Sequence, residues 1–242
     1  DFLELYRTYD CVLQTGGSDQ WGNLTSGTDL IHRAEGKSVH AIGTPLITNS
    51  DGTKFGKSEG NAVWLDANMT SPYAFYQFWL NTDDADVIDR LKVFTFLTRA
   101  QIDELATGVA NEPFKRVAQR TLAYEVTSLV HGTAATDAAI AAAAALFGQG
   151  DLAELDARTL ESALRELPNT TAPTSTQVAQ LLVDTALVDS TSAARRAIAE
   201  GGVYLNNVKI EAQDTTLEGH VLPSRMAVLR RGKKTLAGIF VE

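Results

Sequence analysis

Apolar and polar residues change their spacing several times in the N-terminal part of the chain. Residues 1–9 and 19–36 place apolar side chains at helical spacing, whereas residues 11–14 and 39–48 are short apolar runs. The first run ends at a pair of glycines, and a glycine and a proline interrupt the second. A strand, a helix and a strand of these lengths predict a parallel βαβ unit and therefore an α/β fold.

From Ser71 onward the apolar positions recur at helical spacing. Ser71 is predicted to cap the first of these helices, and Pro72 suits its first position. The aromatic residues that follow share faces of this helix, and we interpret them as core packing. Further helices are predicted for residues 99–110, 113–130 and 136–147.

The composition changes at residues 168–174, which hold two prolines, three threonines and no charge. We predict a linker there. A compact unit follows, with a helix at residues 192–200, a strand at 203–205 and a turn at Asn206-Asn207. Two more strands are expected near residues 208–211 and 226–230.

These changes divide the chain into four predicted segments. An α/β segment covers residues 1–70, an α-helical segment covers 71–167, the linker covers 168–174, and a small α+β segment covers 175–242. Hydrophobic residues make up 44% of the chain, which is enough for packed cores.

The charge is uneven along the chain. The net charge is −9, which argues against a protein coated in basic residues. Residues 1–174 carry a net −10, however, and residues 175–242 a net +1. Such asymmetry often marks a part that meets a polyanion.

The remaining bulk features narrow the class of protein. Cys11 is the one cysteine, which excludes an intrachain disulfide or a site built from several cysteines. No apolar run is long enough to span a bilayer, and no signal peptide is expected. These features fit a reducing cytosol. The chain opens without Met in what reads as a helix, so we expect a fragment of a longer protein.

The first group of candidate site residues is Gly16-Gly17-Ser18-Asp19-Gln20-Trp21-Gly22-Asn23. It follows a strand that we expect to be buried, and it opens a helix, which is where ligands bind in open α/β sheets. Free N–H groups there favour anions, and Asp19 can accept hydrogen bonds from ribose hydroxyls. The alternative is a plain turn in which Asp19 caps the helix.

The second group is Asp51-Gly52-Thr53-Lys54-Phe55-Gly56-Lys57-Ser58. Two lysines three positions apart in a glycine-flanked loop can reach one anion, such as a departing pyrophosphate. The alternative is a solvated surface loop.

The third group is basic and lies in the C-terminal segment. Arg195 and Arg196 sit in a helix that Ser190 or Ser192 would cap and Gly201 would end. Together with further cations these arginines would contact phosphates, unless the charges are simply scattered over a solvated surface. The further cations are Arg225, Arg230, Arg231, Lys233 and Lys234.

Together these three groups resemble the bacterial tyrosyl-tRNA synthetases, which are class I aminoacyl-tRNA synthetases. Residues 16–23 match a signature of that family, and Lys54-Phe55-Gly56-Lys57-Ser58 resembles its second class I motif. Residues 190–206 resemble a small RNA-binding domain first named from a small-subunit ribosomal protein (S-four-like). The resemblance covers essentially the whole chain and implies the C-terminal part of a Rossmann-like catalytic domain, then an α-helical anticodon-side domain, then this α+β domain.

The resemblance also implies a role for each site residue. Asp1, Gln14 and Gln20 would bind tyrosine, with Asp1 on the phenol. Gly17, Asp19 and Ser58 would bind ATP, and Lys54 and Lys57 would be the catalytic residues that stabilise its phosphates. RNA binding would fall to Arg195, Arg196, Arg230, Arg231, Lys233 and Lys234.

The implied activity is that of a tyrosine–tRNA ligase, using L-tyrosine, ATP with Mg²⁺, and tRNA(Tyr). No protein-bound metal is expected, and the complete protein is expected to be a cytoplasmic homodimer without a membrane partner. None of the four histidines forms the family's His-x-Gly-His motif, so these residues alone are expected to be inactive. The rival interpretations are a tryptophanyl-type synthetase and a non-catalytic RNA-binding protein that uses only its C-terminal domain.

Overall fold

The computed structural model of the chain describes residues 1–50, 55, 63–232 and 235–242. Within it the chain forms two compact units, Asp1–Ala62 and Val63–Glu242. Five of the predicted site residues lie outside the described residues: Lys54, Lys57, Ser58, Lys233 and Lys234.

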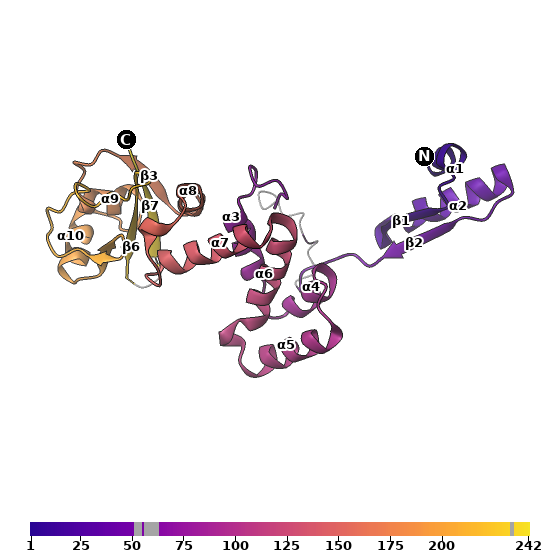
Figure 1. Ribbon diagram of the computed structural model, residues 1–242, viewed down its shortest axis with the longest axis horizontal. Helices are drawn as coiled ribbons and strands as arrows, with labels where there is room; N and C mark the ends of the chain where they lie inside the picture. Colours follow the sequence, from indigo (N-terminus) through magenta and orange to yellow (C-terminus); the bar gives the residue numbers. More distant parts are fainter. Residues whose placement is uncertain (51–54, 56–62, 233–234) are drawn as a thin grey trace. The chain divides into compact units, whose positions relative to one another are not determined.

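The N-terminal unit contains the predicted βαβ arrangement (Figure 1). Strands β1 (Leu13–Gly17) and β2 (His40–Thr44) are parallel, and α2 (Trp21–Glu35) connects them. Helix α1 (Phe2–Tyr9) precedes β1, and a short 3-10 turn, η1 (Ser18–Gln20), leads into α2. The prediction of a parallel βαβ unit is therefore confirmed.

The two strands of this unit are exposed, which corrects the expectation of a buried strand. Leu13 of β1 is 46% exposed and Ile42 of β2 is 50% exposed. The small core lies instead under the helices, where Phe2, Leu24 and Ile31 are buried. The two helices of this unit do not cover both faces of its two-stranded sheet, so apolar side chains remain at the surface.

The second unit begins with a set of helices around an aromatic core. Phe75, Tyr76 and Trp79 of the first helix are buried, and the Phe75 and Trp79 rings meet edge to face at 6.2 Å. This confirms the predicted core role of the aromatic residues. The helices are α3 (Pro72–Leu80), α4 (Val87–Phe94), α5 (Arg99–Asn111), α6 (Val117–His131), α7 (Thr133–Leu146) and α8 (Ala157–Arg165), with 3-10 turns η2 (Pro113–Lys115) and η3 (Leu152–Glu154).

Side-chain caps fix where these helices begin. Ser71 Oγ accepts a hydrogen bond of 3.1 Å from the Ala74 N–H, as predicted. Thr98 and Gln101 form a reciprocal capping box at the start of α5. Asp156 accepts from the Thr159 N–H at 2.9 Å and starts α8. The caps supply partners for N–H groups that would otherwise lack one at a helix start.

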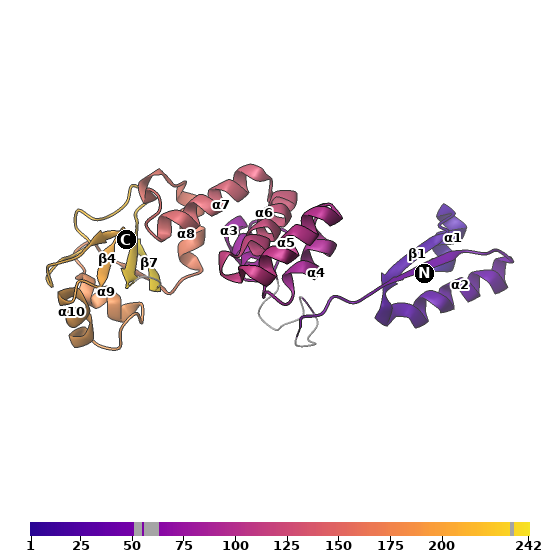
Figure 2. The same cartoon turned by 90° about the horizontal axis from the view of Figure 1, so that it is seen from below.

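The C-terminal part of this unit is a mixed sheet with strand order β3-β7-β6-β4-β5. Figures 1 and 2 show helices α9 and α10 on one side of the sheet and α8 on the other. The strands are β3 (Asn169–Ala172), β4 (Val203–Leu205), β5 (Val208–Lys209), β6 (Met226–Arg231) and β7 (Thr235–Val241), and the helices are α9 (Val178–Asp184) and α10 (Thr191–Ala199).

The segment 168–174, predicted to be a linker, contains strand β3. Residues 169–172 pair in parallel with β7, from Asn169 opposite Gly238 to Ala172 opposite Val241. Its prolines flank the strand and leave its N–H groups free to pair, and its threonines favour a strand. An uncharged edge strand between two prolines has the same composition as a linker, which explains the wrong prediction.

Candidate functional site

A cavity of about 530 Å³ lies in the N-terminal unit, lined by residues of α1, β1, η1 and α2. Asp1, Gln14 and Gln20 all line it. These residues are far apart in sequence, and each was expected to contact the same ligand. They come together because α1 and α2 pack beside β1: Asp1 precedes α1, Gln14 lies in β1 and Gln20 directly precedes α2.

Gln14 presents a buried acceptor that has no partner among the described residues. Its Oε1 atom is buried and makes no hydrogen bond with any of them. A Cβ atom built on Gly27 would lie 3.1 Å from this oxygen and 3.1 Å from Phe2 Cδ1, so a glycine in α2 leaves the room that Gln14 occupies. An unpaired buried acceptor costs about 1–3 kcal/mol, and a ligand that donates to it would recover this.

Gln20 is oriented by its neighbour one turn along. Asn23 Nδ2 donates a hydrogen bond of 2.8 Å to Gln20 Oε1. The amide group of Gln20 therefore turns its nitrogen away from Asn23, and that nitrogen can donate to a ligand in the cavity.

Asp19 lies over the end of β1 because residue 17 is a glycine. A Cβ atom on Gly17 would be 2.8 Å from Asp19 Oδ1 and 3.2 Å from Leu46 Cδ2. The residue that caps α2 is Gln20, without a side-chain bond, and Asp19 lies within η1. Asp19 is thus not the N-cap residue of α2, and its carboxylate lies at the strand end.

Of residues 51–58, which include the two lysines, the structure describes only Phe55. The Phe55 N–H donates a hydrogen bond of 3.1 Å to the Ile47 carbonyl. Ile47 follows Leu46, which would contact a side chain at Gly17. Phe55 is thus held in the same unit as Gly17 and Asp19. Lys54, Lys57 and Ser58 lie outside the described residues.

The basic residues of the C-terminal sheet fall into two kinds. Arg195 and Arg196 are exposed on α10, which begins where Ser190 Oγ accepts from the Ala193 N–H at 3.2 Å. Their side chains make no hydrogen bond or ion pair with any residue that the structure describes. They are therefore available to a ligand.

Arg230 and Arg231 are engaged with the protein itself. The Arg230 guanidinium lies 3.9 Å from the centre of the Tyr204 ring and donates to the Gly232 carbonyl at 2.9 Å. Arg231 Nη1 donates to the Leu187 carbonyl at 2.7 Å. Sequence reasoning could not separate these two arginines from Arg195 and Arg196.

The sheet register adds two residues that sequence reasoning missed. Tyr204 pairs with Lys209 on one side and with Arg230 on the other. Directly opposite residues share one face of a sheet, so a cation, an aromatic ring and a cation form a row. Tyr204 stands between Val203 and Leu205, which are both buried, so the alternation along the strand is the sequence signal that its ring lies on the other face.

Other classes of site find no support in the described part of the chain. Its His, Cys, Asp and Glu side chains form no group of three that could hold a metal ion. No helix among the described residues has the length and apolar character needed to cross a bilayer.

Comparison with known proteins gives two family matches. Residues 1–148 match the family described as "tRNA synthetases class I (W and Y)". Residues 159–238 match the "Tyrosine--tRNA ligase SYY-like C-terminal domain".

Curated relatives match over the whole chain. A "Tyrosine--tRNA ligase" of Leifsonia xyli subsp. xyli is 68% identical over 100% of this chain and 55% of its own length. One of Streptomyces avermitilis is 59% identical over 100% of this chain and 58% of its own length. A solved C-terminally truncated Coccidioides posadasii mitochondrial tyrosyl-tRNA synthetase matches 57% of this chain and 40% of its own, at 36% identity and a TM-score of 0.48. The chain thus spans little more than half the length of the curated relatives.

Proposed function

We propose a function from one premise: this chain belongs to the class I tRNA synthetases, in the group for tryptophan and tyrosine. The complete protein is a tyrosine–tRNA ligase. It joins L-tyrosine to tRNA(Tyr) at the expense of ATP, and the residues described above supply part of its active site. The observation that carries the proposal is the convergence of Asp1, Gln14 and Gln20 on one cavity.

The cavity suits a tyrosine in its hydrogen-bonding groups. The Asp1 carboxylate accepts from the phenol O–H of the substrate, as the family resemblance implies. The unpaired Gln14 Oε1 supplies a second acceptor, and the Gln20 amide can donate. A site that pairs a carboxylate with a phenol distinguishes tyrosine from amino acids that lack this hydroxyl.

ATP binds beside this cavity. Asp19, seated over Gly17 at the end of β1, accepts from the ribose hydroxyls. Lys54 and Lys57 stabilise the triphosphate and Ser58 contacts it, with ATP entering as its Mg²⁺ complex. Support for the lysines comes from their motif and from Phe55 between them, which is anchored at Ile47.

The reaction follows from this placement. A carboxylate oxygen of tyrosine attacks the α-phosphorus of ATP, and the bond to pyrophosphate breaks as the P–O bond of tyrosyl-adenylate forms. A ribose hydroxyl at the 3′ end of the tRNA then attacks the tyrosyl carbonyl carbon and displaces AMP. The side chains form no covalent bond, so positioning and electrostatic stabilisation carry the rate.

The C-terminal sheet and its helices bind the tRNA. Arg195 and Arg196 are exposed and pair with none of the described residues, so they are the arginines best placed to contact phosphates. Arg230, Arg231, Lys233 and Lys234 complete the basic set. The complete protein is a homodimer in the cytoplasm.

Pyrophosphate exchange tests the amino-acid choice. The full-length protein is incubated with ATP and labelled pyrophosphate, with L-tyrosine or L-tryptophan as the amino acid. We expect exchange with tyrosine alone. Exchange with tryptophan and not with tyrosine would identify the protein as a tryptophanyl-type synthetase and contradict the proposal.

The variant Lys57→Ala tests whether the protein is an enzyme or only an RNA binder. We expect its exchange rate to fall at least about a hundredfold, with tyrosine affinity little changed, because the lysine acts on the transition state. Lys92→Ala, which removes an exposed lysine on α4, is the matched control and should keep the full rate. Exchange that persists unchanged in Lys57→Ala contradicts the catalytic role.

A further inference from the structure

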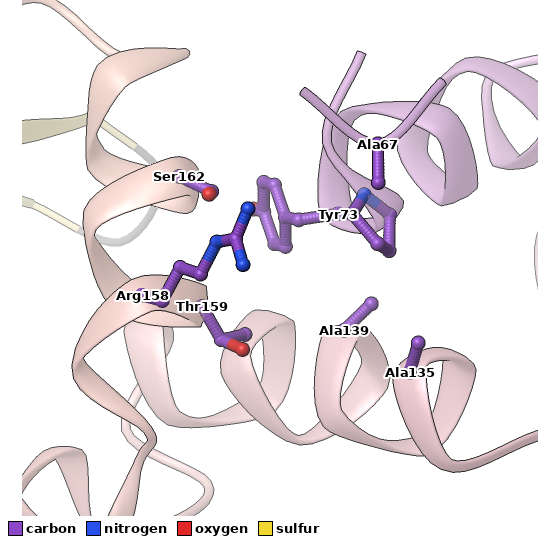
Figure 3. Close-up of a pocket in the computed structure, with 8 residues that line it drawn as sticks. Ala67, Tyr73, Ala135, Ala139, Arg158, Thr159 and Ser162 are labelled. Atoms are coloured by element: carbon purple, nitrogen blue, oxygen red, sulfur yellow. The ribbon is translucent and has the colours of Figure 1, made fainter. Parts of the chain in front are cut away.

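A second cavity lies in the unit Val63–Glu242, where the chain before α3 meets α7 and α8 (Figure 3). Its volume is about 180 Å³. An engineered protein cavity of about 150 Å³ holds a benzene molecule, so this one has room for a single ring or a short branched chain. Neither the proposed reaction nor the tRNA interface uses it.

Small residues and one aromatic ring form its apolar walls. Ala135 and Ala139 are one turn apart on α7, and Ala67 faces them from the segment that precedes α3. Tyr73 is only 7% exposed and contributes its ring. The two residues of α7 that line the cavity are alanines, so no longer side chain of that helix fills it.

Arg158 supplies the charge at this cavity. It extends from α8 toward Tyr73, and among the described lining residues it alone is charged (Figure 3). Its Nη2 atom donates to Asn68 Oδ1 at 3.0 Å. That acceptor is neutral, and although the charge of Arg158 acts on the nearby Asp156 carboxylate, the side chain makes no ion pair with a described residue. The guanidinium can therefore still bind an anion. The hydroxyl of Ser162 lies on the same wall, one turn along α8.

The neighbouring charges limit which anion fits. An adjoining cavity of about 320 Å³ shares Arg158 and Ser162 and is also lined by Glu161, Arg165 and Glu166. Arg165 bonds Glu161 at 2.6 Å, whereas Glu166 raises the local negative potential. A phosphate or nucleotide would carry several charges toward these carboxylates, and a single carboxylate carries one.

Burial, and secondarily Glu166, raises the pKa of Tyr73 to about 12, so its ring stays neutral at physiological pH. Tyr73 therefore adds no charge to the lining of the cavity. We propose that this cavity binds a small organic monocarboxylate with a ring or branched apolar body, which lies against Ala135, Ala139 and Tyr73 while its carboxylate bonds Arg158.

The probe is 4-fluorobenzoate, followed by fluorine NMR in a titration of the full-length protein. We expect saturable binding with a dissociation constant below about 10 mM. The neutral amide 4-fluorobenzamide has the same ring and should bind about tenfold more weakly, since it loses a charge-assisted hydrogen bond. No saturation, or equal binding of acid and amide, would overturn the proposal.

Two variants separate the charge from the hydrogen bond to Asn68. Arg158→Met should weaken 4-fluorobenzoate binding at least about tenfold and leave the amide unchanged. Asn68→Ala breaks the same hydrogen bond but keeps the guanidinium, and it should bind the acid as the wild type does. Equal losses in both variants would show that the contact, and not the charge, matters, which contradicts the proposal.

A third variant fills the cavity. Ala135→Leu places a larger side chain at a half-buried position, and it should abolish binding of both probes while circular dichroism confirms the helical fold. Probe binding that tyrosine displaces and that none of the three variants alters would place the probe in the N-terminal unit and reject the site at Arg158.

Discussion

Arg231 donates a hydrogen bond of 2.7 Å from Nη1 to the backbone carbonyl of Leu187, 44 residues earlier in the chain. Leu187 is buried between α9 and α10, so the bond fastens the end of β6 to the helical side of the sheet. The exposed side chains of Arg195 and Arg196 make no such bond to a described residue. Arginines of the same segment therefore have different roles: Arg231 holds the fold together, whereas Arg195 and Arg196 remain exposed to solvent.

The first prediction concerns stability. Arg231→Gln should lower the free energy of unfolding by about 1 kcal/mol, because the Leu187 carbonyl loses its donor. Urea denaturation followed by circular dichroism measures the change. The matched variant Arg195→Gln removes an exposed arginine and should stay within about 0.5 kcal/mol of the wild type. Equal losses in the two variants would count against a structural role for Arg231.

The second prediction concerns RNA affinity. The double variant Arg195→Gln, Arg196→Gln should weaken tRNA(Tyr) binding and reduce the salt dependence of log K by about 2, close to one per lost phosphate contact. Filter binding at a series of salt concentrations gives the slope.

Arg99→Gln is the control for this measurement. Arg99 is a highly exposed arginine on α5 that pairs with Asp103. Its replacement changes the net charge by the same sign without touching the C-terminal sheet. A salt slope that falls as much per charge for Arg99→Gln as for the double variant would show a non-specific charge effect.

Local sequence rules predict several of the helices and one of the turns. Ser71 and Ser190 cap their helices as expected, and Asn206-Asn207 turns the chain with positive φ angles of 49° and 65°. No pattern above predicts α4, α8, α9 or β7. Helix α9 has only seven residues, so little periodicity builds up along it, and β7 is buried along its middle and shows no alternation. Helix α8, by contrast, carries a sequence signal in its Asp156 cap and in the helical spacing of its buried apolar residues.

The candidate site divides in the same way. Residue types and spacing alone leave Gly17 and Asp19 open to a plain turn; the family resemblance gave them roles. The sequence gives no reason to single out Gly27. Its lack of a side chain leaves space for Gln14, and that space is defined only when α2 packs against β1. Pairing of Tyr204 with Lys209 and Arg230 likewise depends on strand register.

The third prediction concerns pH and His131. Its ring stacks edge to face on Phe75 at 4.8 Å, and its Nε2 atom is buried and has no hydrogen-bond partner in the part of the chain that the structure describes. Burial lowers the pKa of His131 below its ordinary value of 6.5. Below that pH the imidazole of His131 binds a proton more readily in the unfolded chain than in the folded one. The free energy of unfolding is therefore larger at higher pH and decreases as the pH falls.

The variant His131→Phe keeps an aromatic ring against Phe75 and removes the titrating group. Its free energy of unfolding should therefore depend less on pH between about pH 5 and pH 7 than that of the wild type. Urea denaturation of both proteins at several pH values gives the comparison. Parallel curves for the two proteins over this range would refute the role of His131.

The fourth prediction concerns the cavity beside β1. Gly27→Ala adds a Cβ atom 3.1 Å from Gln14 Oε1 and 3.1 Å from Phe2 Cδ1, so one of these side chains must move. If the cavity binds tyrosine, the displaced Gln14 should raise the KM for tyrosine about tenfold in pyrophosphate exchange. The KM for ATP should stay near its wild-type value, since Gly17 and Asp19 are untouched.

Gly108→Ala on α5 separates this steric effect from a general change in helix stability. A Cβ atom on Gly108 meets nothing within 4 Å, so alanine there should stabilise the helix by about 0.5–1 kcal/mol and leave both KM values unchanged. The same gain in propensity acts at Gly27, where crowding opposes it. An unchanged tyrosine KM in Gly27→Ala would mean that Gln14 does not contact the substrate, and the tyrosine site would have to lie elsewhere.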